Sequence, residues 1–156
     1  MKKWFCIAIL CSLITSFTSI KPEVLETANF RMEYPENWKV TNDEGIFNIF
    51  PDNQIGAITV SGYDNLNLPD SEIKKFILEL NSASQPESIV KSKKVGGGTE
   101  YYYDFEDPQS KITVMTKLIK KNNLVYIITL NCKTKYWNGH YRSQFLETYN
   151  SFKLKK

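Results

Sequence analysis

The alternation of apolar and polar side chains predicts a first strand at residues 29–34. Phe30, Met32 and Tyr34 alternate there with polar, mostly charged residues, as expected for a strand with one buried face. A turn is expected at residues 35–37, where a proline, a glutamate and an asparagine follow each other. The folded part of the chain is therefore expected to open with a half-buried strand.

Two further apolar segments predict a hairpin. Residues 45–51 are rich in isoleucine and phenylalanine, and residues 55–63 are rich in β-branched residues. Asp52 and Asn53 lie between the two segments and favour a turn. Both segments are expected to be strands that pair with each other.

The apolar spacing then changes to that of a helix. Asp70 or Ser71 is expected to cap its N-terminus, and the helix should end within residues 81–84, before Pro86. The apolar positions recur at i, i+3, i+4 and i+7, so one stripe of the helix is expected to be buried. The stripe consists of Ile73, Phe76, Ile77 and Leu80.

Strands return in the second half of the chain. Residues 88–95 carry several lysines and predict a strand, and the glycines at 96–98 can turn the chain back. Tyr101, Tyr103 and Phe105 then alternate with polar, mainly acidic residues. This next strand, at residues 100–106, is expected to have one buried aromatic face and one exposed face.

The clearest pattern is a hairpin over residues 111–132. Asn122 and Asn123 tolerate the left-handed backbone of a two-residue turn, and that turn fixes the register. Residues 124–130 are apolar on both faces, so this strand is expected to be central, with a layer covering each face of the sheet. The expected pairs are Lys121 with Leu124, Ile119 with Tyr126, Lys117 with Ile128, and Met115 with Leu130.

The last segment predicts an aromatic helix that begins at Thr134 or Lys135. Its expected buried stripe consists of Trp137, Tyr141, Phe145, Tyr149 and Phe152. Lys153, Lys155 and Lys156 are expected to lie at its negative end. These strands and the two helices predict an α+β fold, with an antiparallel sheet of about six to seven strands covered by helices.

Residues 1–20 are predicted to be a secretory signal peptide. Lys2 and Lys3 precede an apolar run, and small polar residues follow it. The uncharged segment 4–20 is shorter than the roughly 20 residues that a membrane-spanning helix prefers, which leaves an uncleaved N-terminal anchor as the alternative. Residues 21–156 are expected to be a single domain, located outside the bacterial cytoplasm in the periplasm, the envelope or the medium.

Charge and cysteine content narrow the possible functions. The chain has 156 residues and a net charge of +3, which is too balanced for a nucleic-acid-binding protein. Removal of residues 1–20 takes away two lysines and leaves a net charge of +1. It also leaves Cys132 as a single cysteine, which excludes an internal disulfide. The stability of the domain must therefore come from its core.

The segment Phe30-Arg-Met-Glu-Tyr-Pro-Glu-Asn-Trp38 resembles the opening strand of the PsbP-like superfamily, which includes DcrB-like exported proteins. The order of the later elements is also similar to that fold, over residues 28–152. The resemblance implies an α/β/α sandwich around an antiparallel sheet. It further implies a binding or accessory role, and it brings no shared catalytic residues to this chain.

Two residues are candidates for chemistry. His140 is the single histidine, and Cys132 could serve as a nucleophile with His140 as its base. The alternation of the preceding strand instead predicts that Cys132 is a buried, inert thiol. His140 lies beside the aromatic stripe, so stacking, capping or exposure is the favoured interpretation. An enzyme that uses His140 with Cys132 or with a carboxylate remains the alternative function.

Several clusters have both a functional and a structural interpretation. The three glycines lack the lysine and the following helix of a phosphate loop. The acidic side chains could bind calcium, but alternation favours an exposed strand face; they are Glu100, Asp104, Glu106 and Asp107. The lysines could form a basic band or protect an edge strand; they are Lys91, Lys93, Lys94, Lys111, Lys117, Lys120 and Lys121. The tyrosines could line a ligand groove or fill the core; they are Tyr101, Tyr102, Tyr103, Tyr126, Tyr136, Tyr141 and Tyr149.

No catalytic, cofactor-binding or metal-binding residue is assigned from these patterns. The sequence predicts an exported accessory protein without catalytic activity, which binds an envelope protein or a small ligand. No nucleic acid is expected as a partner, and membrane contact is expected only through an uncleaved N-terminal segment.

Overall fold

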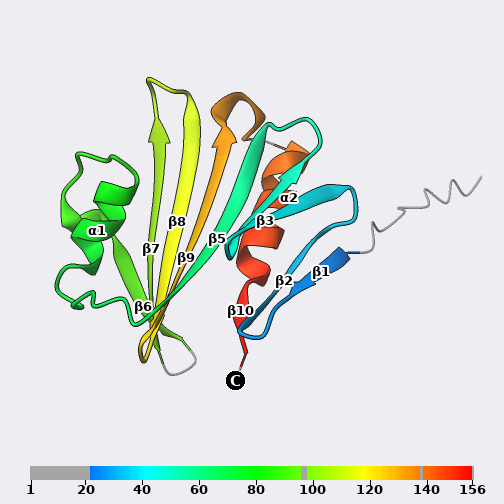
Figure 1. Cartoon of the computed structure of the whole chain (residues 1–156). Coiled ribbons are helices and arrows are strands. Elements are labelled where there is room, and N and C mark those ends of the chain that lie inside the picture. The colour runs from blue at the N-terminus through cyan, green and yellow to red at the C-terminus, as the bar shows by residue number, and fades with distance from the viewer. Residues whose placement is uncertain (1–21, 96–97, 138, 156) are drawn as a thin grey trace, which may run out of the picture.

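The computed structural model describes residues 22–95, 98–137 and 139–155 (Figure 1). The predicted signal peptide at residues 1–20 lies outside the described residues, and so do Gly96 and Gly97 of the predicted turn. Among the described residues, no helix is long and apolar enough to cross a membrane.

Two antiparallel sheets and two α-helices make up the described chain, so the predicted α+β fold class is confirmed. The larger sheet has seven strands in the order β3-β4-β5-β9-β8-β7-β6. These are β3 (Trp38–Asp43), β4 (Ile46–Pro51), β5 (Gly56–Asp64), β6 (Lys91–Val95), β7 (Gly98–Asp107), β8 (Ile112–Lys121) and β9 (Leu124–Lys133).

A second, three-stranded sheet has the order β1-β2-β10. Its strands are β1 (Pro22–Glu26), β2 (Phe30–Pro35) and β10 (Lys153–Leu154). The helices are α1 (Ile73–Leu80) and α2 (Gly139–Ser151), and single 3₁₀ turns precede β6 and α2, η1 at Glu87–Ile89 and η2 at Thr134–Tyr136.

The predicted hairpin of β8 and β9 is confirmed in its register. Lys121 pairs with Leu124 and Met115 pairs with Leu130, as do the two pairs expected between them. Asn122 adopts a positive φ of 55° in the turn. β9 lies between β5 and β8, which confirms that the apolar strand is central.

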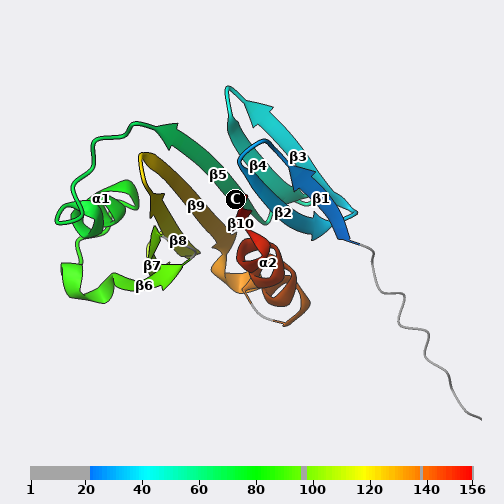
Figure 2. The ribbon, with the colours of Figure 1, turned by 90° about the horizontal axis from the view of Figure 1, so that it is seen from below.

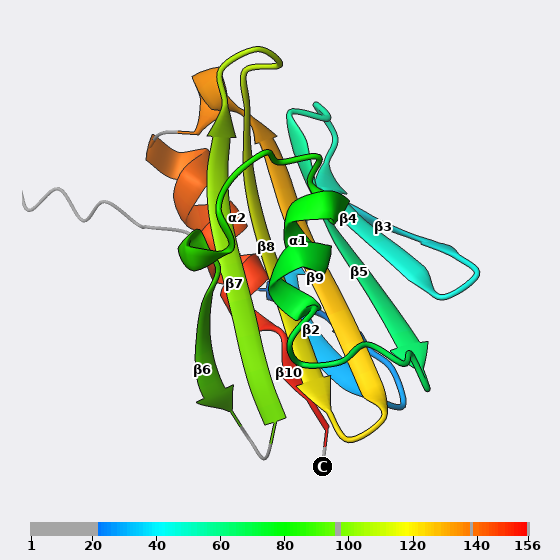
Figure 3. The ribbon, with the colours of Figure 1, turned by 90° about the vertical axis from the view of Figure 1, so that its left-hand side faces the viewer.

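The two faces of the large sheet are covered by different layers. α1 lies on one side of the strands, and α2 lies on the other side together with β1, β2 and β10 (Figure 2). α1 crosses over β7, β8 and β9 (Figure 3), where Ile73 and Ile77 join Leu118 and Ile127 in one apolar cluster.

The larger core lies between α2 and the sheet and is strongly aromatic. The ring of Phe30 lies 5.2 Å from that of Phe152 and 5.8 Å from that of Tyr126. The rings of Trp38 and Phe145 are 4.7 Å apart. Phe30 lies in the predicted first strand, and Trp38 follows the predicted turn. Both side chains are buried, so they contribute to packing.

The structure corrects the strand inventory. β1, β3 and β10 were not predicted from the sequence, and β2, expected in the main sheet, belongs to the smaller one. β3 joins the main sheet instead, beside β4. Of these strands, β10 depends on a distant partner, because its two residues are defined as a strand only by their contact with β2.

The helix boundaries also differ from the prediction. The N-cap position of α1 is occupied by Glu72, whose side chain makes no capping bond, and Asp70 instead pairs with Lys120 at 2.8 Å. Leu80 is 47% exposed, while Leu78 takes the buried position. α2 begins at Gly139 rather than at Thr134, because residues 134–136 form a separate 3₁₀ turn.

Candidate functional site

The space between the sheet and each helix is filled by two apolar clusters, and the concave features of the described chain are open depressions at its surface, two of which lie beside α2. One of them is a groove of about 510 Å³, here called the α2–β2 groove. It is lined by Pro22, Glu33, Tyr34, Pro35, His140, Ser143, Gln144, Glu147, Thr148 and Ser151.

A polar stripe of α2 forms one wall of this groove. His140, Ser143, Gln144 and Glu147 follow each other at i, i+3, i+4 and i+7, which places them on one face of the helix. This stripe lies beside the buried aromatic stripe and faces β2 across the groove. The wall therefore offers imidazole, hydroxyl, amide and carboxylate groups in a single row.

The floor of the groove is held by Ser151. Its Oγ accepts a hydrogen bond from the backbone N–H of Glu33 at 2.8 Å. The same hydroxyl lies 2.7 Å from the carbonyl oxygen of Thr148 and 3.0 Å from that of Glu33, and either can accept its proton. The last turn of α2 is thereby fixed to β2, so the two walls keep their spacing.

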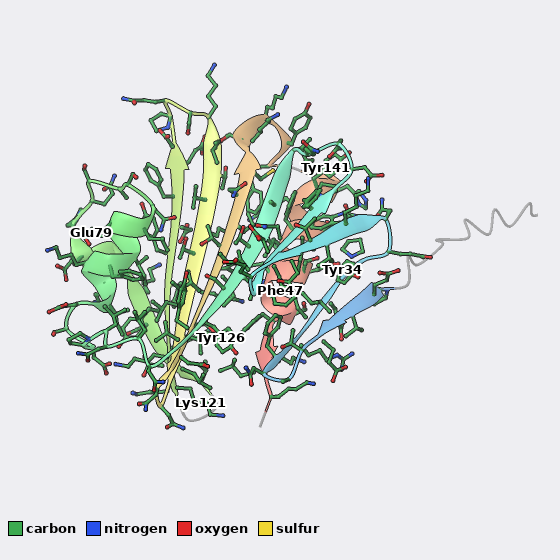
Figure 4. All side chains as sticks on the ribbon, viewed as in Figure 1. Tyr34, Phe47, Glu79, Lys121, Tyr126 and Tyr141 are labelled. Carbon is green, nitrogen blue, oxygen red and sulfur yellow. The ribbon has the colours of Figure 1, made fainter. Side chains whose placement is uncertain are left out.

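Tyr34 is fixed on the opposite wall. Its hydroxyl donates to a carboxylate oxygen of Glu23 at 2.7 Å, and the side chain lies beside α2 in Figure 4. This hydrogen bond, followed by burial, raises the pKa of Tyr34 to about 12, so the phenol stays protonated at neutral pH. Arg31 pairs with Glu33 at 3.0 Å at the edge of the same wall.

The structure separates the two residues of the candidate catalytic pair. Cys132 is 1% exposed, and burial raises its pKa to about 11, which confirms the predicted buried thiol. It borders a different depression, next to Ile55 and Gly56. His140 is exposed in the α2–β2 groove, where it is brought together with the carboxylates of Glu33 and Glu147.

The hydroxyl of Ser143 also lies in the groove but is directed to its own helix. Ser143 Oγ donates to the carbonyl oxygen of His140 at 2.9 Å. The proton that a general base would remove is therefore bound to the backbone. This arrangement orders the groove wall and provides no activated nucleophile.

The lysines do not form a single basic band, which was one of the two interpretations of their pattern. Lys93 pairs with Glu100 on the face of the sheet that carries α2, at 3.0 Å. Lys120 pairs with Asp70 beside α1, on the opposite face. The strand period divides the lysines between the two faces, so their charges do not add.

Lys117 differs from the other lysines of this group because it is buried. It is 5% exposed, and its Nζ donates to the backbone oxygen of Tyr149 in the last turn of α2 at 2.5 Å. The ammonium also lies 4.1 Å from the centre of the Tyr149 ring. Burial lowers the pKa of Lys117 to about 8, although the charge of Glu100 acts in the opposite direction.

The predicted hairpin register already implied that Lys117 would be buried. The predicted register places Lys117 opposite Ile128, on a face of β9 that was expected to be covered. At the negative end of α2, where the C-terminal lysines were expected, the structure places the ammonium group of Lys117. Lys153 instead lies in β10, and Lys155 pairs with Glu26 at 2.7 Å.

The acidic residues do not gather into a metal site. Within the described ranges, no group of three histidine, cysteine or acidic side chains is placed to hold a metal ion. Glu100 is paired with Lys93, and Asp107 accepts hydrogen bonds from the Ser110 hydroxyl and the Gln109 N–H. These bonds, that of Ser110 first, hold the pKa of Asp107 below its ordinary value.

The tyrosines mainly fill the core, as expected from their periodicity. Tyr101, Tyr103, Tyr126 and Tyr149 are buried, and Tyr102, Tyr136 and Tyr141 are half-buried. None of these seven lines the α2–β2 groove, where the aromatic side chain is Tyr34. The groove was not predictable from the helix pattern alone, because its polar stripe becomes a wall only where β2 lies opposite.

Comparison with solved structures finds the same architecture elsewhere. The solution structure of cyanobacterial PsbP (CyanoP) from Synechocystis sp. PCC 6803 superposes with a TM-score of 0.65 at 11% sequence identity, covering 90% of this chain and 96% of that one. A crystal structure from Bacteroides thetaiotaomicron VPI-5482 superposes with a TM-score of 0.53 at 17% identity. That match covers 81% of this chain and 45% of the other, so this chain spans less than half of its length. No protein-family model matches the chain, and no curated protein matches it at a significant level.

Proposed function

Starting from its PsbP-like fold, we propose that this chain is a non-catalytic accessory domain of the bacterial cell envelope that binds a protein partner in the α2–β2 groove. The observation that carries the proposal is the polar stripe of α2, which faces the fixed wall of β2 across an open groove. The filled interior favours an external interaction surface over an enclosed ligand cavity.

The lining of the groove favours a polar, basic segment of the partner. Glu147 supplies a carboxylate, Glu33 supplies a second one that already pairs with Arg31, and Gln144 and His140 supply further hydrogen-bonding groups. The rings of Tyr34 and the neighbouring prolines offer an apolar contact along the β2 wall. An extended segment with lysine or arginine side chains is complementary to both.

The extracytoplasmic location rests on the pattern of residues 1–20. A positive start, an apolar run and a polar exit are typical of a secretory signal. A domain with one buried cysteine needs no disulfide and is not exposed to thiol oxidation at its surface.

An enzyme is the second candidate, in the form that uses His140 with Glu33 or Glu147. The shared groove is the observation that favours it, since Cys132 lies elsewhere. Within the described residues, however, no hydrogen bond joins His140 to either carboxylate. A catalytic histidine needs an orienting partner, so the binding function is preferred.

Affinity capture from envelope extract, with the chain as bait, distinguishes the binding function from the enzymatic one. The proposal expects a stoichiometric protein partner that is retained by His140→Ala with an affinity changed less than about fivefold, the equivalent of 1 kcal/mol. A chain that captures no partner but turns over an envelope substrate, and loses this activity in His140→Ala, would be an enzyme instead.

A further inference from the structure

We propose that a second cavity, on another flank of α2, binds a free α-amino acid with an apolar side chain. The cavity has a volume of about 280 Å³ and lies between α2 and the outer strands β7 and β8. Its principal lining residues are Asp104, Glu106, Met115, Trp137, Arg142 and Leu146. This inference is independent of the α2–β2 groove, because the two sites share no lining residue.

One wall of the cavity carries two carboxylates. Asp104 and Glu106 are two residues apart in β7, so they point to the same face of the sheet, and both are exposed. Asp104 pairs in register with Met115, whose side chain belongs to the same face as the core under α2. The acidic wall therefore rises directly from an apolar floor.

The other wall carries a guanidinium group in a defined orientation. Arg142 lies with its central carbon 5.9 Å from the centre of the Trp137 ring. This stacking limits the rotation of the arginine side chain. Leu146 follows one turn later in α2 and extends the apolar surface that begins at Met115.

The opposite charges of the two walls are not joined to each other in an ion pair. In the part of the chain that the structure describes, no ion pair within 4.0 Å involves Asp104, Glu106 or Arg142. A ligand with one ammonium and one carboxylate group on the same carbon would pair with both walls at once. Its side chain would then cover the floor.

The size of the cavity limits the ligand further. Sites for drug-sized ligands occupy roughly 300–1,000 Å³, so a cavity of about 280 Å³ is suited to a smaller molecule. A free amino acid carries both charges at one end, whereas a peptide separates them by at least one residue. The presence of both charges and an apolar floor in so small a cavity favours the free amino acid, with leucine as a suitable probe.

Titration of the full chain with leucine, followed by nuclear magnetic resonance, tests the proposal. Leucine should shift the methyl signal of Met115 and the indole N–H signal of Trp137. Leucine amide and N-acetyl-leucine should each bind roughly fivefold more weakly, since each loses one ion pair of up to about 1 kcal/mol. N-acetyl-leucine amide should bind more weakly than both.

Variants of the cavity test which wall binds the carboxylate of leucine and which binds its ammonium group. Arg142→Gln should weaken leucine binding roughly fivefold and abolish the preference for leucine over leucine amide. The double variant Asp104→Asn, Glu106→Gln should abolish the preference for leucine over N-acetyl-leucine. Arg31→Gln, an exposed arginine on β2, is the matched control and should bind like the unaltered chain.

Two results would overturn the proposal. One is the absence of shifts at Met115 and Trp137 up to the solubility of leucine. The other is equal binding of leucine and N-acetyl-leucine amide, which would show an apolar depression without recognition of either charge.

Discussion

At the scale of single residues, the environment of Lys117 departs most from what its type suggests. An ammonium group is buried between β8 and α2, where it binds a carbonyl of the last helical turn. This contact joins a strand to a helix 32 positions further along the chain. The residue therefore contributes to holding α2 in place, at the cost of taking a charge out of water.

The buried ammonium predicts a pH-dependent stability. The native pKa of Lys117 is about 8 and its ordinary value is 10.5, so the unfolded chain binds the proton more tightly. Below pH 8 the buried ammonium is charged, so the folded state is destabilised by the full cost of burying that charge. Between pH 8 and 10.5, the free energy of unfolding should rise relative to that of Lys117→Met by about 1.4 kcal/mol per pH unit, up to roughly 3 kcal/mol.

Urea unfolding of both proteins from pH 7 to 10.5 measures this difference. Groups other than Lys117 titrate in both chains, so the difference isolates the lysine. Lys91→Met is the control, because Lys91 is an exposed lysine in β6 and should follow the unaltered chain. Parallel curves for the unaltered chain and Lys117→Met would contradict the assignment.

The buried hydroxyl of Tyr103 predicts a substitution that stabilises the fold. It is 2% exposed, and among the described residues its hydroxyl is the buried side-chain group without a hydrogen-bond partner. Tyr103→Phe removes this group without changing the ring, so the free energy of unfolding should rise by about 1 kcal/mol. Tyr34→Phe removes a hydroxyl that donates to Glu23 and should lower it by up to about 1 kcal/mol. Thermal or urea unfolding compares the two, and a loss of stability in Tyr103→Phe would indicate a hidden partner.

At the scale of elements, local patterns were sufficient wherever a turn and a strand period act together. The hairpin of β8 and β9 was predicted to the residue, because Asn122 and Asn123 fix the turn and alternation fixes the faces. β10 was not predictable in this way, because its strand character comes from pairing with β2, near the other end of the described chain. The signal for β3 was local but was not recognised: Glu44 and Gly45 both have positive φ and form a two-residue turn that pairs β3 with β4.

The packing of β5 against β9 and α2 gives an element-scale prediction. A Cβ at Gly56 would lie 2.9 Å from both Cys132 Cα and Phe145 Cζ, and nearer still to the carbonyl oxygen of Asn131. Backbone atoms of a central strand cannot move aside, so Gly56→Ala should lower the free energy of unfolding by roughly 3 kcal/mol.

Gly62→Ala in the same strand is the matched comparison. Its Cβ would meet a ring atom of Tyr126 at 2.7 Å, and a side chain can yield where a backbone cannot. A loss of about 1 kcal/mol is expected there. Equal losses in the two variants, measured by urea unfolding, would contradict the argument from backbone contact.

At the scale of the whole molecule, the fold class and the two covering layers followed from the sequence. The central strand β9, apolar on both faces, required a layer on each side, and α1 and α2 supply them. The candidate site did not follow. The stripe of His140, Ser143 and Glu147 becomes one wall of a groove only because β2 folds back beside α2.

The central claim is that the α2–β2 groove binds a protein partner, and Ser143→Tyr tests it most directly. Ser143 is exposed at the groove wall, so a tyrosine there fills the groove without disturbing the core. Asn150→Tyr places the same side chain at an exposed position of α2 outside the groove.

The measurement is the affinity of the captured partner for the unaltered chain and for both variants, by calorimetric titration. If the partner binds in the α2–β2 groove, Ser143→Tyr weakens binding at least about tenfold, equivalent to 1.4 kcal/mol, while Asn150→Tyr leaves it unchanged. Equal affinity of the partner for Ser143→Tyr and for the unaltered chain would show that the groove is not the binding site.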